Sequence, residues 1–334
     1  MKRYLEHKSI DVLGIGNAIV DVVANVKENF LKDNNLSKGV MKLISEEEAA
    51  KLNRMINAVK ISSGGSAANT IAGLAVLGNS VAFIGKVKND DFGAVFEKDL
   101  KNLGVIFNTK KEDRSFSSTA VCIVLTTSDA QRTMNTCLGV AGTLSPDDID
   151  EELVANSSIV YLEGYLWDQQ QAKNAFLKAI DIAHKNKGKV ALSLSDPFCV
   201  ERHRIEFLNL IQNNVDILFA NEIEILSLFE LKDFDSIKRN CKESDIIFAI
   251  TRSEKGSIII ADNKEYIVEA ERTEVVDSTG AGDLYAAGFL NGLIKNKDLY
   301  SCGKMGSILA AETISHFGAR PNISLNDLLK SKGF

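Results

Sequence analysis

The sequence predicts an α/β protein in which a mostly parallel central sheet is covered by helices on both faces and a small second sheet is attached. Three observations support this fold class. Short apolar runs alternate with helical stretches along most of the 334 residues, as in the strand–helix–strand units of parallel sheets. Two regions interrupt this alternation with more polar strands. A chain of this length, 45% hydrophobic, can form a main domain with a smaller appendage.

The apolar runs predict the strands of the central sheet at residues 10–15, 81–84, 159–162, 190–194, 217–219, 246–250 and 257–261. Helical patterns lie between several of these runs, at residues 67–77, 169–187, 202–212, 223–229 and 234–241. Parallel strands joined by helices take right-handed crossovers by default, so both faces of the sheet are expected to be covered.

The small sheet is predicted from two insertions, at about residues 17–44 and 117–138, in a chain that otherwise forms one α/β body. Residues 17–26 and 40–44 are expected as strands, and residues 117–126 and 132–138 as a hairpin around residues 128–131. Their partly alternating polarity is typical of a half-exposed sheet. A small sheet attached to a large body can act as a lid over a ligand site.

Composition and charge argue against several classes of protein. The formal net charge of −6 argues against nucleic acid or an anionic membrane as the partner. The 5 cysteines form no CxxC pair and the 4 histidines form no HxH or HExxH motif, so we expect no structural metal. Scattered cysteines in a long chain are typical of reduced thiols and predict a cytoplasmic protein.

Two segments bear on targeting and membrane insertion. Residues 1–8 are polar and charged, and only a short apolar stretch follows, which does not predict a signal peptide. Residues 61–85 carry no charge but contain many Ser, Gly, Asn and Thr residues. These polar groups would be costly in lipid, so the segment is expected to be a buried helix and strand and not a membrane span.

The segment with the most chemical information is residues 277–283, DSTGAGD, a glycine-rich turn that leads into an apolar helix. Free N–H groups and the helix dipole at such a start favour an anion, and Gly280, Ala281 and Gly282 leave room for it. Asp283 at this helix start is either an N-terminal helix residue or a general base beside the anion. The glycines on its approach side favour the base.

Other segments place polar groups at the ends of strands and the starts of helices. Gly64 and Gly65 precede a helix that contains Asn69, while Asn17 and Asp21 follow the first strand. A carboxylate such as Asp21 can accept two hydroxyl groups at once, as a ribose diol would offer. The structural alternatives are a simple strand-to-helix turn and a solvated strand residue.

A second pair of segments follows later strands. Asn221 and Glu224 open a helix after the strand at residues 217–219, at the edge where α/β proteins bind ligands. Asn221 would also serve as an ordinary helix cap. Thr251 and Gly256 bound a turn after the strand at residues 246–250, for which a plain β-turn is the alternative.

These segments together resemble the ribokinase/PfkB family of small-molecule kinases over nearly the whole chain. DSTGAGD is similar to the family's DTxGAGD signature, residues 63–70 to its GG…N signature, and residues 221–224 to its NxxE motif. Residues 251–256 resemble its T-x-G-x-x-G loop, with Ser253 in place of the usual glycine. The resemblance implies a ribokinase-like three-layer α/β/α body with a small β-sheet lid.

The resemblance also implies a role for each matching residue. Asp283 would be the catalytic base, and the backbone of Gly280, Ala281 and Gly282 the anion hole for the γ-phosphate of ATP. Substrate-binding roles fall on Asn17, Asp21, Gly64, Gly65 and Asn69, and nucleotide-binding roles on Asn221, Thr251, Gly256, Asp277, Thr279, His316 and Gly318. Glu224 would organise Mg²⁺. Activation by K⁺, which some relatives show, stays open.

Two cations were not assigned by these motifs alone. Arg132, on a predicted lid strand, would either reach the transferring phosphoryl group or remain a surface residue. The role of Lys86 stays open.

The acceptor is expected to be adenosine. Residues 65–70, 192–198 and 131–135 look closer to adenosine kinases than to ribokinases or fructokinases, which implies transfer to the 5′-OH of adenosine to give AMP. A ribose- or fructose-type sugar kinase of the same family is the alternative. A nucleoside needs an apolar slot for its base, for which the lid offers Val40, Met41, Cys122, Val124 and Leu138.

Functions outside the kinase class are less well supported by the sequence. A Rossmann oxidoreductase is disfavoured because Ile19 stands where the third glycine of the dinucleotide fingerprint is required. A non-catalytic nucleoside-binding protein would have no need of Asp283 beside an anion site. The oligomeric state stays open between a monomer and a homodimer formed through the lid.

Overall fold

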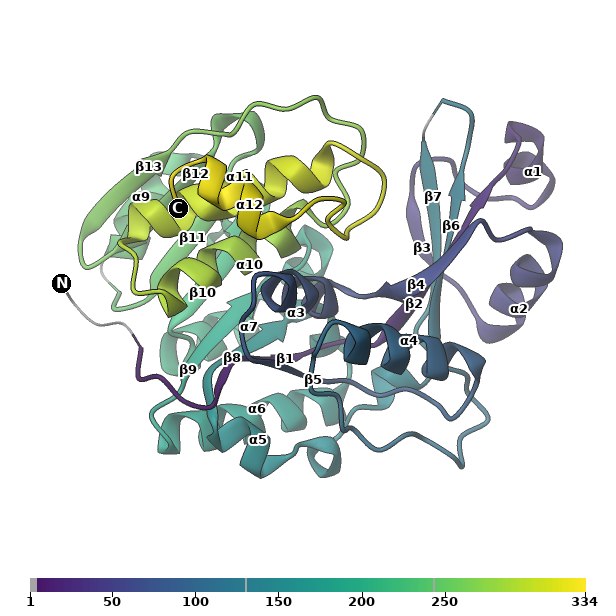
Figure 1. The fold of residues 1–334 in the computed structure, drawn as a ribbon, viewed down its shortest axis with the longest axis horizontal. Helices are drawn as coiled ribbons and strands as arrows, with labels where there is room; N and C mark the ends of the chain where they lie inside the picture. The colour runs from purple at the N-terminus through teal and green to yellow at the C-terminus, as the bar shows by residue number, and fades with distance from the viewer. Residues whose placement is uncertain (1–4, 130, 243) are drawn as a thin grey trace.

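The computed structural model describes residues 5–129, 131–242 and 244–334, which form a three-layer α/β/α body with a smaller sheet at one side (Figure 1). In these residues the main sheet has eight strands in the order β13-β12-β11-β10-β9-β8-β1-β5. Strands β5 to β11 of this order pair in parallel, and β12 and β13 extend the sheet antiparallel. The bounds are β1 Ile10–Ile15, β5 Val81–Ile84, β8 Ser157–Glu163, β9 Lys189–Ser193, β10 Ile217–Asn221, β11 Ile247–Thr251, β12 Ser257–Ala261 and β13 Lys264–Val268.

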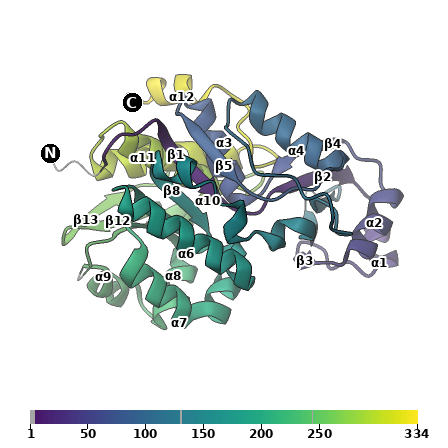
Figure 2. The same cartoon turned by 90° about the horizontal axis from the view of Figure 1, so that it is seen from below.

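Helices cover both faces of this sheet (Figures 1 and 2). One face carries α3 (Ser66–Val76), α10 (Ala281–Ile294) and α11 (Leu299–Ile314), against which α12 (Leu325–Ser331) packs. The other face carries α5 (Glu151–Ala155), α6 (Gln170–Lys185), α7 (Pro197–Asn214), α8 (Glu222–Phe229) and α9 (Phe234–Lys242). Each face buries its own apolar cluster, the first around Phe219 and Phe289 and the second around Phe176 and Phe207.

The small sheet has five strands in the order β3-β7-β6-β2-β4. Their bounds are β2 Ile19–Asn25, β3 Met41–Leu43, β4 Lys60–Gly64, β6 Ala120–Thr126 and β7 Arg132–Cys137. Helices α1 (Glu28–Asp33) and α2 (Glu46–Met55) lie on its side away from the body, while α4 (Asp91–Asn102) packs against β4 (Figure 1). One face of the small sheet is therefore left toward the body.

The predicted fold class is confirmed, and the predicted strands of the main sheet are present within a few residues of their expected bounds. Two strands were not predicted, β4 and β13. Strand β4, with the sequence KISSG, is too polar to stand out as a strand, and it gains its pairing from β2 alone, with Ile19 opposite Gly64 and Val23 opposite Lys60. Strand β13 is a half-exposed edge strand with only β12 as neighbour.

The structure also bears on the predictions about membrane spans, cysteines and the N-terminal segment. Within the described ranges no helix is long and apolar enough to cross a membrane. The cysteines at positions 122, 137, 199, 241 and 302 are buried and free. Residues 1–4 of the polar N-terminal segment and residue 130 of the predicted hairpin turn lie outside the described residues.

Candidate active site

A cavity of about 1060 Å³ lies between the carboxyl ends of the main strands and the small sheet. Parallel strands bring their carboxyl ends to one edge, and Glu163 of β8, Asn221 of β10 and Thr251 of β11 all line the cavity there. The cavity brings together most of the residues selected from the sequence, namely Asn17, Asp21, Gly65, Asn69, Arg132, Asn221, Glu224, Thr251, Thr279, Gly280, Ala281, Gly282, Asp283 and Gly318.

The start of α10 has the geometry of an anion site. Gly280 adopts a left-handed backbone with φ of 79°, and a Cβ there would lie 2.5 Å from the Cβ of Ala319, so only glycine fits. An added Cβ at Gly282 would meet nothing within 4 Å, which shows open space beside the first turn of the helix. Because the first N–H groups of a helix lack intrahelical acceptors, this open side can receive an anion.

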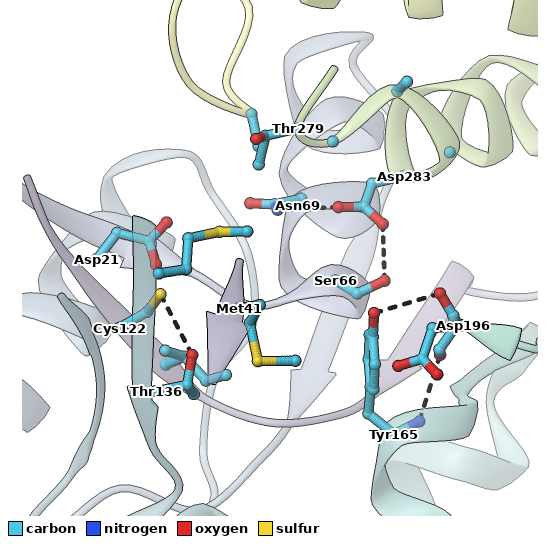
Figure 3. A pocket seen from close by; sticks show the side chains of 18 of the residues that line it. Asp21, Met41, Ser66, Asn69, Cys122, Thr136, Tyr165, Asp196, Thr279 and Asp283 are labelled. Carbon is cyan, nitrogen blue, oxygen red and sulfur yellow. Dashed lines mark hydrogen bonds between the residues drawn. The ribbon is translucent and has the colours of Figure 1, made fainter. Parts of the chain in front are cut away.

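Asp283 is held at the junction of two helix starts (Figure 3). The Ser66 hydroxyl donates to Asp283 Oδ1 at 2.6 Å, and Asn69 Nδ2 donates to Oδ2 at 2.9 Å. Thr70 Oγ1 donates to the Asp283 carbonyl at 3.1 Å, which joins the first turns of α3 and α10. Burial raises the pKa of Asp283, against the opposing effects of Ser66, Asn69 and the positive charge of Arg320. The carboxylate is therefore oriented and partly desolvated, as a general base requires.

Asp21 lies on the other side of the cavity, on β2 of the small sheet. Its carboxylate faces Gly64 of β4, where an added Cβ would lie 2.4 Å from Asp21 Oδ2. Gly64 does not line the cavity itself, so its glycine is explained by the space that Asp21 needs. Burial raises the pKa of Asp21 to about 6.

Glu163 was not selected from the sequence, and it joins two predicted segments. One of its oxygens accepts from the Asn17 backbone N–H and from Asn17 Nδ2, each at 2.7 Å, and the other accepts from the Ala67 N–H at 2.7 Å. The side chain is 1% exposed, and burial raises its pKa to about 7. A charged residue at the carboxyl end of a buried strand was the signal that could have identified it.

Two buried amide oxygens in the cavity have no protein partner among the described residues, Asn17 Oδ1 and Asn69 Oδ1. Buried polar atoms are almost always hydrogen-bonded in a folded protein. The Nδ2 of the same Asn17 side chain donates to Glu163, and the Nδ2 of Asn69 donates to Asp283, so both amides are held in place. They are therefore free to accept hydroxyl groups of a bound ligand.

The helix cap expected at Asn221 as the structural alternative is present, and Asn221 and Glu224 also line the cavity. Asn221 Oδ1 accepts from the Glu224 N–H, and both Glu224 oxygens accept from Asn221, at 2.8 Å from its N–H and 2.6 Å from Nδ2. Glu224 is 6% exposed, lines the cavity, and has its pKa raised by burial to about 7. In the described part of the chain no cluster of three or more His, Cys, Asp or Glu side chains could enclose a metal ion.

Arg132 reaches the body from β7. Its Nη1 lies 2.7 Å from Asp277 Oδ2, and its guanidinium lies over the Phe317 ring at 5.5 Å from the centroid. Asp277 also accepts from the Thr279 N–H and hydroxyl and from the Gly318 N–H. Asp277 thus organises the loop before the anion site and does not line the cavity itself.

The remaining selected residues lie outside the cavity lining. Gly256 has φ of 81°, and a Cβ there would lie 2.1 Å from the Val268 carbonyl, so its role in this structure is a turn. His316 Nε2 pairs with Glu312 Oε1 at 3.0 Å. Lys86 pairs with Asp148 at 3.2 Å, away from the lining residues.

The face of the small sheet toward the cavity carries both apolar and polar side chains. Asp21, Arg132 and Thr136 are among the polar ones. The apolar ones, with Leu138 just after β7, are Ile19, Val23, Met41, Leu43, Cys122, Val124, Met134 and Leu138. Of the five residues expected to line a base slot, Val40 is 50% exposed and does not line the cavity. Met41 pairs with Met134 across β3 and β7, so two flexible thioethers lie side by side on this face.

Residues 15–325 match the pfkB family of carbohydrate kinases, which are phosphotransferases with an alcohol acceptor. An oriented carboxylate beside an open helix start, in a three-layer α/β body with an attached sheet, is consistent with such an enzyme. The chain belongs to this family, and the ribokinase-like fold expected from the sequence is confirmed.

Similar proteins include both nucleoside and sugar kinases. The chain is 42% identical to the adenosine kinase from Sinorhizobium meliloti, whose structure matches with a TM-score of 0.89 over 97% of this chain and 100% of the other. It is 41% identical to a probable sugar kinase from Rhizobium etli, with a TM-score of 0.90 and coverage of 98% and 99%. It is 26% identical to a 5-dehydro-2-deoxygluconokinase from Clostridium botulinum, over 80% of this chain and 84% of the relative.

Proposed function

We propose that this kinase transfers the γ-phosphate of ATP to the 5′-hydroxyl of adenosine, giving AMP and ADP. One observation carries the choice of acceptor. A single cavity joins polar groups at Asp21, Asn69 and Asp283 to an apolar patch on the small sheet that includes Met41, Leu43 and Met134. A nucleoside has a polar ribose and a flat, largely apolar base, whereas a free sugar has no group to place against the apolar patch.

The polar groups supply the hydrogen-bond partners that a ribose needs. The Asp21 carboxylate can accept from two hydroxyl groups, and the unpartnered oxygens of Asn17 and Asn69 add two further acceptors. This set faces the cavity from β2, α3 and the loop between β1 and β2. It matches a diol on the ribose and leaves the 5′-hydroxyl for Asp283.

In the proposed reaction Asp283 takes the proton of the 5′-hydroxyl as its oxygen bonds to the γ-phosphorus. The bond between that phosphorus and the bridging oxygen of ADP breaks, and ADP leaves with the bond's electron pair. The N–H groups of Gly280, Ala281 and Gly282 at the start of α10 stabilise charge on the transferred group. The two hydrogen bonds to Asp283 and the open space beside Gly282 support these roles. The Ala281 N–H donates to the Ser278 carbonyl at 3.3 Å and would exchange that partner for the phosphate.

When bound with ATP, Mg²⁺ would offset the negative charge of the phosphates. Glu224 is the residue that would hold it, because its buried carboxylate faces the cavity beside Asn221. Mg²⁺ usually keeps several waters and binds through few protein groups, which fits a site without a cluster of carboxylates in the described residues. Arg132, now paired with Asp277, is close to the anion-site loop and adds a second positive charge.

A sugar kinase of the same fold is the second candidate. The names of the Rhizobium etli and Clostridium botulinum relatives favour it. The polar groups of the cavity alone would suit a free sugar.

The deciding experiment measures ADP release from ATP with adenosine, inosine, ribose, fructose and 5-dehydro-2-deoxygluconate as separate acceptors. We expect kcat/KM for adenosine to exceed that for every free sugar by at least about 100-fold, roughly the value of burying one base. A sugar that equals or exceeds adenosine would overturn the proposal in favour of the second candidate.

A matched pair of variants tests the apolar slot. Met134→Gln places a polar amide on the cavity face, and Met55→Gln makes the same change on α2, at a residue that is 47% exposed and outside the cavity. We expect Met134→Gln to raise the adenosine KM about tenfold and to leave the KM for ATP unchanged. Equal adenosine KM values for the two variants would show that the base does not occupy this face.

A further inference from the structure

Arg320 lines the cavity from the loop between α11 and α12, and no motif in the sequence assigned it a role. The same loop supplies Phe317 and Gly318 to the cavity, and in Figure 1 it extends on the side of the body that faces the small sheet. Arg320 Nη1 donates to the Ala68 carbonyl at 3.1 Å. Its Nη2 donates to the Ser63 carbonyl at 3.2 Å and to the Ser63 hydroxyl at 3.0 Å.

These bonds hold the peptide by which the small sheet joins α3. Ser63 is the penultimate residue of β4, and its N–H donates to Asp99 Oδ2 on α4 at 2.8 Å. Arg320 and Asp99 therefore hold Ser63 from opposite ends of the same residue. The next residue, Gly64, faces the Asp21 carboxylate, and α3 begins at Ser66, which donates to Asp283. A shift of Ser63 would move both carboxylates of the acceptor site.

The charge of Arg320 also acts on both carboxylates. It opposes the desolvation that raises the pKa of Asp21 and of Asp283. Burial lowers the pKa of Arg320 itself to about 10, so it stays protonated at neutral pH. The other titratable groups that interact with Asp283 are carboxyls and phenols, namely Asp21 on β2, Tyr161 and Glu163 on β8, and Tyr165 in the turn after β8. Asp21 also interacts with two further cations, Arg132 on β7 and Lys60 on β4, which lower its pKa.

We propose that Arg320 is a positioning residue that links the loop between α11 and α12 to the peptide at Ser63 and supplies part of the positive charge that offsets Asp21 and Asp283. The inference rests on the proposed role of Asp283 as the base. Arg320 then has two separable effects. Hydrogen bonds from both of its terminal nitrogens position Ser63 and Ala68, and its positive charge acts on the two carboxylates.

The test compares Arg320→Gln and Arg320→Lys with the wild type. Arg272→Gln is the control, because Arg272 is exposed and outside the cavity. The measurement is kcat and the acceptor KM from pH 5 to 9. For Arg320→Gln we expect the acidic side of the pH profile of kcat/KM to shift to higher pH by about one unit, because loss of a nearby positive charge raises the pKa of a carboxyl group. For Arg320→Lys we expect the acidic side of the profile to stay and the acceptor KM to rise, because lysine lacks the planar fork.

A second readout needs no acceptor. In urea denaturation, the free energy of unfolding of Arg320→Gln should fall further below that of the wild type as the pH rises from 5 to 8. Without the charge of Arg320, the pKa values of Asp21 and Asp283 in the folded state would lie further above their pKa values in the unfolded chain. Ionising these carboxyls as the pH rises would therefore destabilise the folded variant more than the folded wild type.

The outcomes separate the inference from the proposed function. A uniform loss of kcat/KM at every pH, with a constant stability difference, would overturn the inference and leave Arg320 an ordinary structural residue. If the wild type phosphorylates none of the five acceptors, the proposed function fails, and the denaturation series alone decides the inference. A shift of the acidic side of the profile together with a widening stability difference supports both.

Discussion

At the scale of single residues, the carboxylate of Asp283 is oriented by side chains far from it in the sequence. Its two donors, Ser66 and Asn69, lie 217 and 214 residues away along the chain. Each donor occupies one oxygen of the carboxylate and leaves further lone pairs for the proton of an alcohol. The orientation of this carboxylate therefore depends on two helix starts that meet, and the DSTGAGD motif supplies one of them.

Asp283→Asn should lower kcat by about 10²- to 10⁴-fold, the usual contribution of a general base. The amide keeps the size of the side chain but cannot take the proton. Binding of ATP, followed by calorimetry, should persist, since the anion site at Gly280–Gly282 consists of backbone groups. Asp235→Asn on α9, where the side chain is 81% exposed, is the control. A kcat near that of the control would show that Asp283 is not the base.

Glu163 predicts a pH dependence of stability. Its folded pKa of about 7 lies above the ordinary 4.5, so the folded state holds the proton more tightly. Its stabilising contribution is complete below about pH 4.5 and is lost as the pH rises to about 7. Glu163→Gln, which gives up the acceptor for the Ala67 N–H, should cost about 1–3 kcal/mol at pH 5.5.

The difference in the free energy of unfolding between the wild type and Glu163→Gln should therefore narrow between pH 5.5 and 7.5, because the variant has no carboxyl to ionise there. Urea denaturation at three pH values measures it. A difference that stays constant or widens would contradict the raised pKa of Glu163.

At the scale of elements, the pairing of β2 with β4 shapes the acceptor end of the site. Gly64 lies opposite Ile19 in this antiparallel pair, and its missing side chain leaves the space that the Asp21 carboxylate occupies. The sequence predicted that Gly64 would bring backbone against the substrate. The structure gives it a different immediate neighbour, because the pairing of the two strands places a side chain of the protein there first.

Gly64→Ala should raise the acceptor KM at least about tenfold, because its Cβ would lie 2.4 Å from Asp21 Oδ2 and displace that carboxylate. The KM for ATP should change little. Gly142→Ala is the matched control, since a Cβ there meets its nearest neighbour, the Gln169 side chain, at an ordinary 3.7 Å. An unchanged acceptor KM in Gly64→Ala would mean that Asp21 does not bind the acceptor.

Helix α8 shows how one set of residues serves two purposes at the scale of an element. The reciprocal bonds between Asn221 and Glu224 cap the helix, as the sequence-based alternative expected. The same bonds hold the Glu224 carboxylate at the cavity. The structural and the functional interpretations of this motif are therefore compatible.

At the scale of the whole molecule, Arg132 is one of the residues through which the small sheet contacts the body. Its guanidinium contacts Asp277 and Phe317, which belong to two different loops of the body. Through Asp277 these contacts extend to Thr279 and Gly318. The position of the small sheet is thereby linked to the loop that precedes the anion site.

Arg132→Met should lower kcat by about 10- to 100-fold, because it removes a charge near the transferring group and releases Asp277. Arg132→Lys should recover part of this loss, since lysine keeps the charge without the planar fork. Steady-state kinetics at saturating ATP and acceptor measures both. Arg114→Met, at an exposed residue outside the cavity, serves as control. If Arg132→Met has the same kcat as Arg114→Met, Arg132 does not contribute to phosphoryl transfer.

Local pattern determined most of the fold. Apolar runs such as β1 and β12 were located to the residue, because strands buried in a parallel or central position need continuous apolar side chains. Strand β4 was not predicted because it is a polar edge strand that forms only by pairing with β2. The small sheet therefore draws on one chain segment more than the two insertions predicted from the sequence.

The sequence by itself determined the class of chemistry of this protein. Glycine-rich turns and polar residues at strand ends are local features, and backbone rules place them at one edge of the sheet. Only the tertiary structure decided which groups meet there. Glu163 between Asn17 and Ala67, Arg320 on Ser63, and Arg132 on Asp277 are contacts between distant segments. Their formation depends on the packing of whole helices and sheets, which no local pattern records.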